Sequence, residues 1–220
     1  MRRALGTALV VAGLLVLADA AATLAWQEPL SAWRAARTQH HLAAQLHALE
    51  LSAPRHASDR ARLAIDARAL GRSRRDGQAL AELRIARIGL RAVVVRGTTP
   101  ADLREGPGLI AGTALPGQHA TTAIAGHRTT YGAPFRHLDA LRRGDEITVR
   151  LPYGTFRYAV QDRRIVQPRD LSVLRRVGHD RLVLSACHPL FSAARRIVVF
   201  ARLTGVGQSA TRGGPHVRAG

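Results

Sequence analysis

Residues 82–203 predict an all-β domain, either a barrel or a sandwich. Roughly seven or eight short segments in this range have the alternating or continuously apolar pattern of strands, and turns rich in Gly or Pro separate them. No long amphipathic helix lies between these segments, which argues against a fold of β-α-β units. An apolar segment and an Arg-rich linker precede this domain, and a Gly-rich tail follows it.

Residues 4–26 are predicted to form a transmembrane helix because they are almost entirely apolar. At 1.5 Å per residue such a helix is about 34 Å long, which is enough to cross a bilayer core. Arg2 and Arg3 come before it, so residues 1–3 are predicted to be cytoplasmic and the rest extracellular. A cleaved signal peptide is the alternative, since residues 18–22 contain Ala-x-Ala patterns. We favour the uncleaved anchor because the apolar run continues past these sites.

Residues 27–81 are predicted to be a juxtamembrane helix and an Arg-rich linker. Apolar residues recur near helical spacing over 29–51, and Pro54 follows this run. A second short helix is expected over 57–70. The many arginines after residue 52 suit either a surface segment beside anionic lipid or wall polymer, or a plain solvated spacer.

The β-domain is expected to begin with two strands, over residues 83–88 and 90–95. Thr99 and Pro100 are typical of a helix N-cap and first position, so a helical turn is expected over 99–105. Further strands are predicted over residues 121–126, 146–151, 155–166, 181–186 and 195–203. The other predictions are turns over 106–117, short helices over 134–141 and 170–174, and a disordered tail over 204–220.

The chain carries a formal net charge of +18, and all 33 residues of the Lys and Arg class are arginines. Asparagine is absent as well, and depletion of both residue types is typical of a GC-rich genome. A charge of this size favours contact with polyanions. Aromatic residues make up only 4% of the chain and no nucleic-acid motif is present, so we expect a solvated basic surface and no nucleic-acid partner.

Cys187 is the only cysteine, which excludes an intramolecular disulfide and a multi-cysteine zinc site. It follows the apolar run 182–186, while His127 ends another predicted strand and Arg195 and Arg196 open the last one. A thiol, an imidazole and a guanidinium at strand ends are typical of covalent acyl chemistry. A buried structural cysteine is the alternative for Cys187 taken alone.

Such chemistry needs a thiolate, and a thiol with its usual pKa of about 8.5 supplies little of it at neutral pH. His127 is the candidate to stabilise the thiolate and to protonate the leaving amine. Arg195 or Arg196 is the candidate to stabilise the oxyanion of the tetrahedral intermediate. Strand alternation turns these two arginines to opposite faces, but the pattern does not indicate which face carries the site.

The spacing argues against other sites built on this cysteine. A phosphatase loop requires an arginine at the position of Ala193, and papain-like peptidases place the nucleophile before the histidine, whereas His127 precedes Cys187. An L,D-transpeptidase has Ser-x-Gly-Cys where this chain has Ser-Ala-Cys. His119, His127, Cys187 and His188 have no metal-ligand spacing, so we expect no metal and no cofactor.

From about residue 82 to 203 the chain resembles the sortases, which are membrane-anchored cysteine transpeptidases of Gram-positive bacteria. The matching motifs are Ala-Ile-Ala-Gly-His-Arg at 123–128, Leu-Ser-Ala-Cys at 184–187 and Arg-Ile-Val-Val-Phe-Ala at 196–201. The second motif corresponds to the family's Thr-Leu-x-Thr-Cys pattern without its usual threonines. The Cys-His-Pro sequence and the His-Arg-Thr-Thr-Tyr-Gly loop are most similar to class E-type sortases of high-GC actinobacteria.

The resemblance implies an eight-stranded β-barrel with short helices behind the N-terminal transmembrane helix. It implies that Cys187 is the nucleophile, that His127 is the general acid and base, and that Arg196 binds substrate and stabilises the oxyanion. Arg195 is the alternative for the role of Arg196.

Four further residues are candidates for substrate contacts. Ser185 and Ala186 lie in the strand that helps to form the family's substrate groove. Tyr131, in the loop after the catalytic histidine, either lines this groove or anchors the loop. His188 follows the nucleophile directly, and strand alternation favours a packing or surface role for it.

In the family reaction, a sorting signal of the Leu-Pro-x-Thr-Gly or Leu-Ala-x-Thr-Gly kind is cleaved after threonine, and an amine on a cell-wall precursor or pilin resolves the thioacyl enzyme. The implied partners are surface proteins that carry the signal, the amine acceptor and the membrane. We expect a monomer in the cell membrane, with a single-pass anchor and an extracellular catalytic domain. The alternative is a catalytically inactive sortase-fold module that binds wall polymer or another polyanion.

Overall fold

The computed structural model describes residues 2–25, 29–52 and 59–208. Its helices are α1 (Arg2–Ala25), α2 (Pro29–Ser52), α3 (Arg60–Ser73) and α4 (Pro100–Glu105), with 3-10 helices η1 (Ala86–Ile88), η2 (Leu138–Ala140) and η3 (Leu171–Leu174). Its strands are β1 (Ala79–Ile85), β2 (Leu90–Arg96), β3 (Gly108–Leu109), β4 (Thr121–Ala125), β5 (Glu146–Leu151), β6 (Gly154–Val166), β7 (Arg181–His188) and β8 (Arg195–Gly207).

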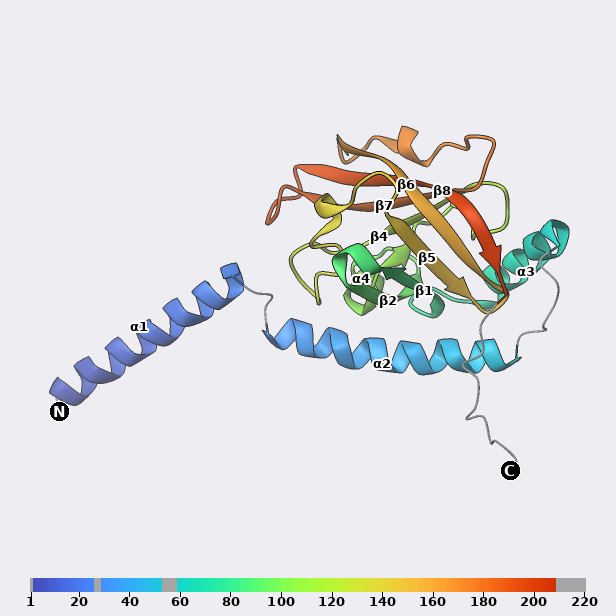
Figure 1. Ribbon diagram of the computed structural model, residues 1–220. Coiled ribbons are helices and arrows are strands. Elements are labelled where there is room, and N and C mark those ends of the chain that lie inside the picture. Colours follow the sequence, from blue (N-terminus) through green and yellow to red (C-terminus); the bar gives the residue numbers. More distant parts are fainter. Residues whose placement is uncertain (1, 26–28, 53–58, 209–220) are drawn as a thin grey trace, which may run out of the picture.

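The eight strands close into a barrel in the order β1-β2-β3-β4-β7-β8-β6-β5 (Figure 1). The pairs β2–β3 and β4–β7 are parallel, and the other pairs are antiparallel. The prediction of an eight-stranded barrel with short helices is therefore confirmed, and the sandwich is excluded.

Strand β7 is buried on both faces, which explains why its sequence is continuously apolar instead of alternating. Leu182 and Leu184 point into the main core of the barrel. Val183 belongs to a second cluster with Ala123 and Val198 on the outer face of β4, β7 and β8. Ile110, directly after β3, and Val173 and Leu174 of η3 pack against this cluster, so the barrel has an outer apolar layer on this side.

Helix α2 packs along the outer face of β1 and β2 (Figure 1). Leu42 and Leu46 contribute the apolar contact and are almost fully buried. The side chain of Gln39 accepts a hydrogen bond of 2.6 Å from the backbone N–H of Val93 and donates one of 2.8 Å to the carbonyl of Glu105. The predicted juxtamembrane helix is therefore part of the folded body.

Helix α3 is also part of that body, since Leu63, Ala67 and Leu70 belong to the main core. The carboxylate of Asp59 caps its N-terminus by accepting from the backbone N–H of Ala61. The residues predicted to be a linker thus close one end of the barrel.

The remaining differences from the sequence prediction have local causes. Strand β3 lies within the predicted turns because only its two residues pair, with β2 and β4. The helix predicted over 134–141 is reduced to η2, since turns around the fully buried Phe135 take its place. Strand β8 extends into the predicted tail, because it pairs with β6 as far as Gly207. Residues 209–220 lie outside the described residues.

The predicted anchor corresponds to α1, which extends away from the barrel (Figure 1). Within the described part of the chain, no helix combines the length and the apolar character that a membrane span requires. Trp26, at the end of the predicted span, lies outside the described residues. The anchor over residues 4–26 stays a prediction from the sequence.

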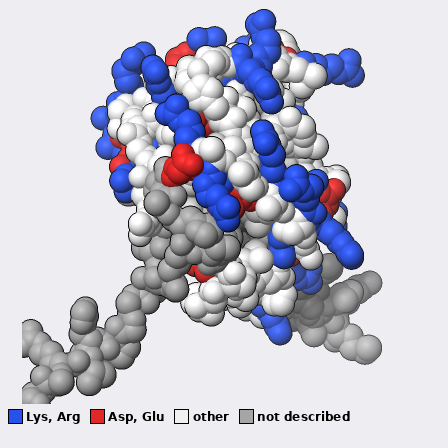
Figure 2. All heavy atoms as spheres, turned by 90° about the vertical axis from the view of Figure 1, so that its right-hand side faces the viewer, with Lys and Arg blue, Asp and Glu red and all other residues white. Residues whose placement is uncertain are grey.

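Arginine side chains are spread over the face of the molecule beside α3, with fewer carboxylates among them (Figure 2). Some arginines of the molecule are paired locally, as in the ion pairs of Arg96 with Asp76 and of Arg62 with Asp66. This distribution is consistent with the solvated basic surface expected from the composition.

Replacement of Leu46 by alanine is expected to loosen α2, because Leu46 is only 2% exposed against the barrel. A buried Leu-to-Ala change costs about 2 kcal/mol or more, so backbone amides of α2 should exchange with deuterium roughly 30-fold faster in Leu46→Ala. The matched control is Leu51→Ala on the same helix, because Leu51 is 61% exposed. Equal exchange rates in the two variants would contradict the packing described here.

Candidate active site

The parallel pairing of β4 with β7 brings the candidate nucleophile and the candidate base to one edge of the barrel. Ala125 lies opposite Ser185, and the backbone N–H of Gly126 donates a 3.0 Å hydrogen bond to the carbonyl of Ser185. His127 and Cys187 each follow this matched pair by the same number of residues. Since parallel strands run in the same direction, both side chains lie at the same end of the sheet.

The pairing of β7 with β8 decides between the two arginines. Cys187 lies opposite Arg196, and His188 lies opposite Arg195. Directly opposed residues of antiparallel strands place their side chains on the same face. The thiol therefore shares its face with Arg196, which is half-buried, while Arg195 is exposed.

This face is the outer side of the barrel. Val183 packs in the outer apolar cluster. Cys187 lies an even number of residues further along β7, so its side chain points to the same face. Val198 packs in that cluster as well, and Arg196, two residues before it in β8, points to the same outer face. The apolar outer layer is therefore continuous with the candidate site.

A cavity of about 300 Å³ unites these side chains. Five of the residues predicted from the sequence line it, namely His127, Ser185, Ala186, Cys187 and Arg196. The other three predicted site residues, Arg195, Tyr131 and His188, are not among its lining residues.

The imidazole of His127 is held by the loop that follows β4. Its ring centroid lies 5.0 Å from that of Tyr131, and its backbone carbonyl accepts a 2.9 Å hydrogen bond from the N–H of Phe135. The guanidinium of Arg104, on α4, lies 5.9 Å from the centroid of the Tyr131 ring. Tyr131 thus contacts the candidate base from outside the cavity and anchors its loop.

Burial lowers the pKa of His127 below its usual value, and the positive charge of Arg104 lowers it further. The neutral imidazole is therefore favoured, and it accepts a proton from a nearby thiol more readily than a charged ring would. This environment suits a group that exchanges protons during a reaction.

His188 has a structural partner instead of a place in the cavity. Arg128 is only 3% exposed. Its guanidinium lies 3.1 Å from the Nδ1 atom of His188 and 2.9 Å from the Oδ1 atom of Asp139. Because arginine only donates, Nδ1 is the acceptor. Arg128 therefore ties the loop after β4 to the end of β7, a role that the sequence analysis missed. The sequence feature that could have indicated this role is Arg128 itself, a basic residue directly after His127.

Arg196 is positioned by the loop between β7 and β8. Its Nη1 atom donates hydrogen bonds of 2.9 Å to the carbonyl of Ala193 and 3.0 Å to the carbonyl of Arg195. These bonds hold the guanidinium at the rim of the cavity, where it is available to a developing negative charge.

Two segments that the sequence analysis did not connect with the site form the remaining walls. Residues 166–174, between β6 and β7, contribute apolar side chains such as Leu171 and Leu174. Thr98 and Ile110, which flank β3 and α4 in the chain, line the cavity as well. Within the residues that the structure describes, no group of three or more His, Cys, Asp or Glu side chains is arranged to hold a metal ion.

Comparisons with known proteins agree on one family. A model of the sortase domain matches residues 83–204, more than half of the chain. Sortase D of Bacillus subtilis is 30% identical over 131 residues, which are 57% of this chain and 64% of that protein. The chain thus spans a little less than two thirds of this curated relative.

Solved structures of sortases have the same fold. The crystal structure of sortase E1 from Streptomyces coelicolor, with a tripeptide in its active site, matches with a TM-score of 0.59 and 26% identity, over 65% of this chain and 98% of that chain. The SrtF sortase of Corynebacterium diphtheriae matches with a TM-score of 0.60 and 28% identity, over 65% and 93% of the two chains.

Replacement of Arg104 by glutamine is expected to raise the pKa of His127, because one of the two causes of its depression is removed. Burial remains, so the pKa of His127 should stay below that of a free histidine. Titration of the imidazole proton resonances by NMR measures the change. Arg202→Gln, at an exposed position of β8, is the matched control for the loss of one positive charge. A His127 titration that is the same in both variants would exclude Arg104 as a cause.

Proposed function

Because the chain belongs to the sortase family, we propose that it is a cysteine transpeptidase with Cys187 as the nucleophile, His127 as the general acid and base, and Arg196 as the oxyanion-binding group. Sortases are cysteine transpeptidases as a family. The observation that carries the residue assignment is the single cavity lined by all three side chains.

In the proposed reaction, the neutral imidazole of His127 takes the proton of the Cys187 thiol, and the resulting thiolate attacks the carbonyl carbon of the peptide bond. The guanidinium of Arg196 stabilises the negative charge on the carbonyl oxygen. The peptide carbon–nitrogen bond then breaks, and His127 passes its proton to the leaving amine. The product of this first half is a thioester between Cys187 and the acyl part of the substrate. Support for these roles comes from the β7–β8 register, which places Arg196 directly opposite Cys187.

The proposed donor is a surface protein with a Leu-Pro-x-Thr-Gly or Leu-Ala-x-Thr-Gly sorting signal, cleaved after threonine. The apolar wall formed by Val166, Leu171 and Leu174 suits the leucine and the proline or alanine of such a signal. The proposed acceptor is an amine on a cell-wall precursor or on a pilin subunit.

We place the enzyme in the cell membrane as a monomer, with residues 4–26 as a single-pass anchor and the barrel on the extracellular side. Residues of α1 such as Leu9, Leu14 and Leu17 are exposed, so the barrel does not cover this apolar stretch. Such an arrangement would hold the active site near a wall precursor at the membrane surface.

Incubation with a panel of sorting-signal peptides is expected to give a thioacyl adduct in the wild type and none in Cys187→Ala. Intact-mass spectrometry should show the peptide truncated after threonine bound to the wild-type chain. Absence of an adduct across the panel, together with a Cys187 that does not react with iodoacetamide, would contradict the transpeptidase. That outcome would favour the polyanion-binding module, for which the net charge of +18 is the supporting observation.

The neighbouring arginines offer a matched pair of variants. Arg196→Ala is expected to slow formation of the thioacyl adduct by about 100-fold or more, because removal of one oxyanion donor has an effect of this size. Arg195→Ala removes the same charge from the opposite, exposed face and should change the rate by less than about threefold. The rate is measured by quenching the reaction at timed intervals. Equal losses in the two variants would contradict the assignment to Arg196.

A further inference from the structure

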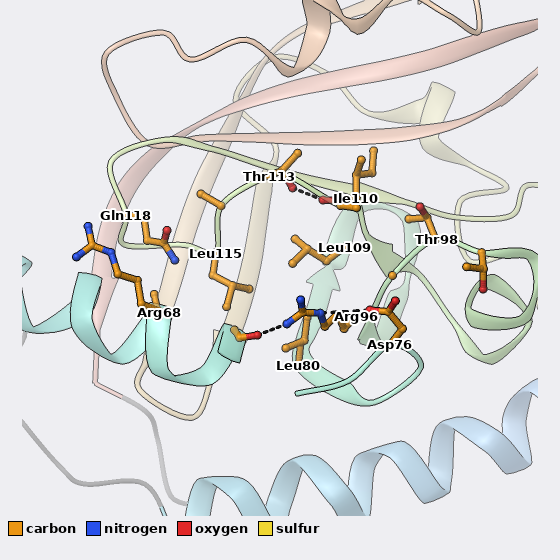
Figure 3. A pocket seen from close by; sticks show the side chains of 17 residues that line it. Arg68, Asp76, Leu80, Arg96, Thr98, Leu109, Ile110, Thr113, Leu115 and Gln118 are labelled. Atoms are coloured by element: carbon orange, nitrogen blue, oxygen red, sulfur yellow. Dashed lines mark hydrogen bonds and ion pairs between the residues drawn. The ribbon is translucent and has the colours of Figure 1, made fainter. Parts of the chain in front are cut away.

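A second cavity, of about 490 Å³, lies next to the catalytic one. It is bounded by α3, the ends of β1 and β2, and the loop that follows β3 (Figure 3). Thr98 and Ile110 line both cavities. The second cavity is therefore adjacent to the catalytic one and shares these two lining residues with it.

The two ends of this cavity differ in chemistry. Leu80, Leu109 and Leu115 form an apolar middle, and Thr98 lies at the end shared with the catalytic cavity (Figure 3). Arg68 and Gln118 lie together at the other end in this view. The far end thus presents a guanidinium and a carboxamide.

The charged groups of the cavity are not equivalent. Arg96 donates a 3.2 Å hydrogen bond to Asp76 and further hydrogen bonds to the carbonyls of Gly71 and Arg74. Its guanidinium is therefore occupied by contacts within the fold. The side chains of Arg68 and Gln118 make no hydrogen bond or ion pair with any described residue. Among the described residues, nothing occupies the guanidinium of Arg68, so it is available to an anion that enters the cavity.

We propose that this cavity binds the acceptor substrate, a peptide whose amine reaches the thioester past Thr98 and Ile110 while its carboxylate pairs with Arg68. The inference rests on the proposed transpeptidase function. The neutral amine nitrogen bonds to the thioester carbon and the carbon–sulfur bond breaks. The proton that the nitrogen loses returns to the sulfur of Cys187 through His127. The products are a new amide and the free thiol.

The polarity of the two cavities assigns them to the two substrates. The catalytic cavity has the apolar wall of residues 166–174, which suits the apolar residues of a sorting signal. The second cavity ends in Arg68, a cation without an ion-pair partner among the described residues, and it complements the negative end of a short peptide. The donor and the acceptor thus occupy different cavities, which meet at Thr98 and Ile110.

Triglycine and triglycinamide are the probes that test this assignment, because both carry the amine and only triglycine carries a carboxylate. The full chain in detergent is first acylated with a sorting-signal peptide, and each probe is then titrated to obtain its KM in the second half-reaction. Arg68→Ala is expected to raise the KM for triglycine about threefold, the effect of losing an exposed ion pair. It should leave the KM for triglycinamide and the rate of thioacyl formation unchanged. Arg68→Lys should retain most of the affinity for triglycine.

Arg72→Ala is the matched control, because Arg72 is exposed on the same helix and does not line the cavity. This variant should change neither KM. Three results overturn the inference: equal effects of Arg68→Ala on both probes, no effect on triglycine, or slower thioacyl formation, which would assign the cavity to the donor. A wild-type chain that forms no thioacyl adduct would instead refute the proposed function itself.

Discussion

The parallel contact between β4 and β7 is the constraint on which the candidate site depends. It aligns Ala125 with Ser185, so that the next outward-facing residue of each segment is His127 or Cys187. Strand β8 then adds Arg196 opposite the cysteine. A shift of β7 by one residue would turn the thiol to the inner face of the barrel. Such a shift would also move Leu182 and Leu184 out of the core, so burial on both faces of β7 keeps the register that the site needs.

The helices before the barrel are connected to the site through the elements that they contact. Gln39 of α2 binds the carbonyl of Glu105 at the end of α4. The same helix α4 carries Arg104, whose charge lowers the pKa of His127. Helix α3 supplies Arg68 to the second cavity. The Arg-rich segment that could have been a solvated spacer therefore lines the second cavity through α3, because the apolar residues of this helix are buried in the core of the barrel.

The sequence prediction was correct for elements with a strong pattern of their own, such as alternation of apolar and polar residues or a helix cap. The alternation over residues 146–151 gave β5 with its observed bounds, and Thr99 with Pro100 indicated the start of α4, where a capping box is present. Prediction was wrong where long-range contacts override the local pattern. Strand β3 has only two residues and is defined by its neighbours on either side. The segment around Phe135 is held in turns because that ring is buried against Gly126.

The sequence by itself determined which chemical groups are available: one thiol, a histidine at a strand end, two adjacent arginines, and membership of the sortase family by its motifs. Alternation also placed Arg195 and Arg196 on opposite faces of their strand. Only the tertiary structure decided which arginine faces the thiol, that His188 is tied to the buried Arg128, and that a second cavity adjoins the first. The physical reason is that strand register and cavity shape arise from contacts between distant segments, and such contacts leave no periodic signal in either segment alone.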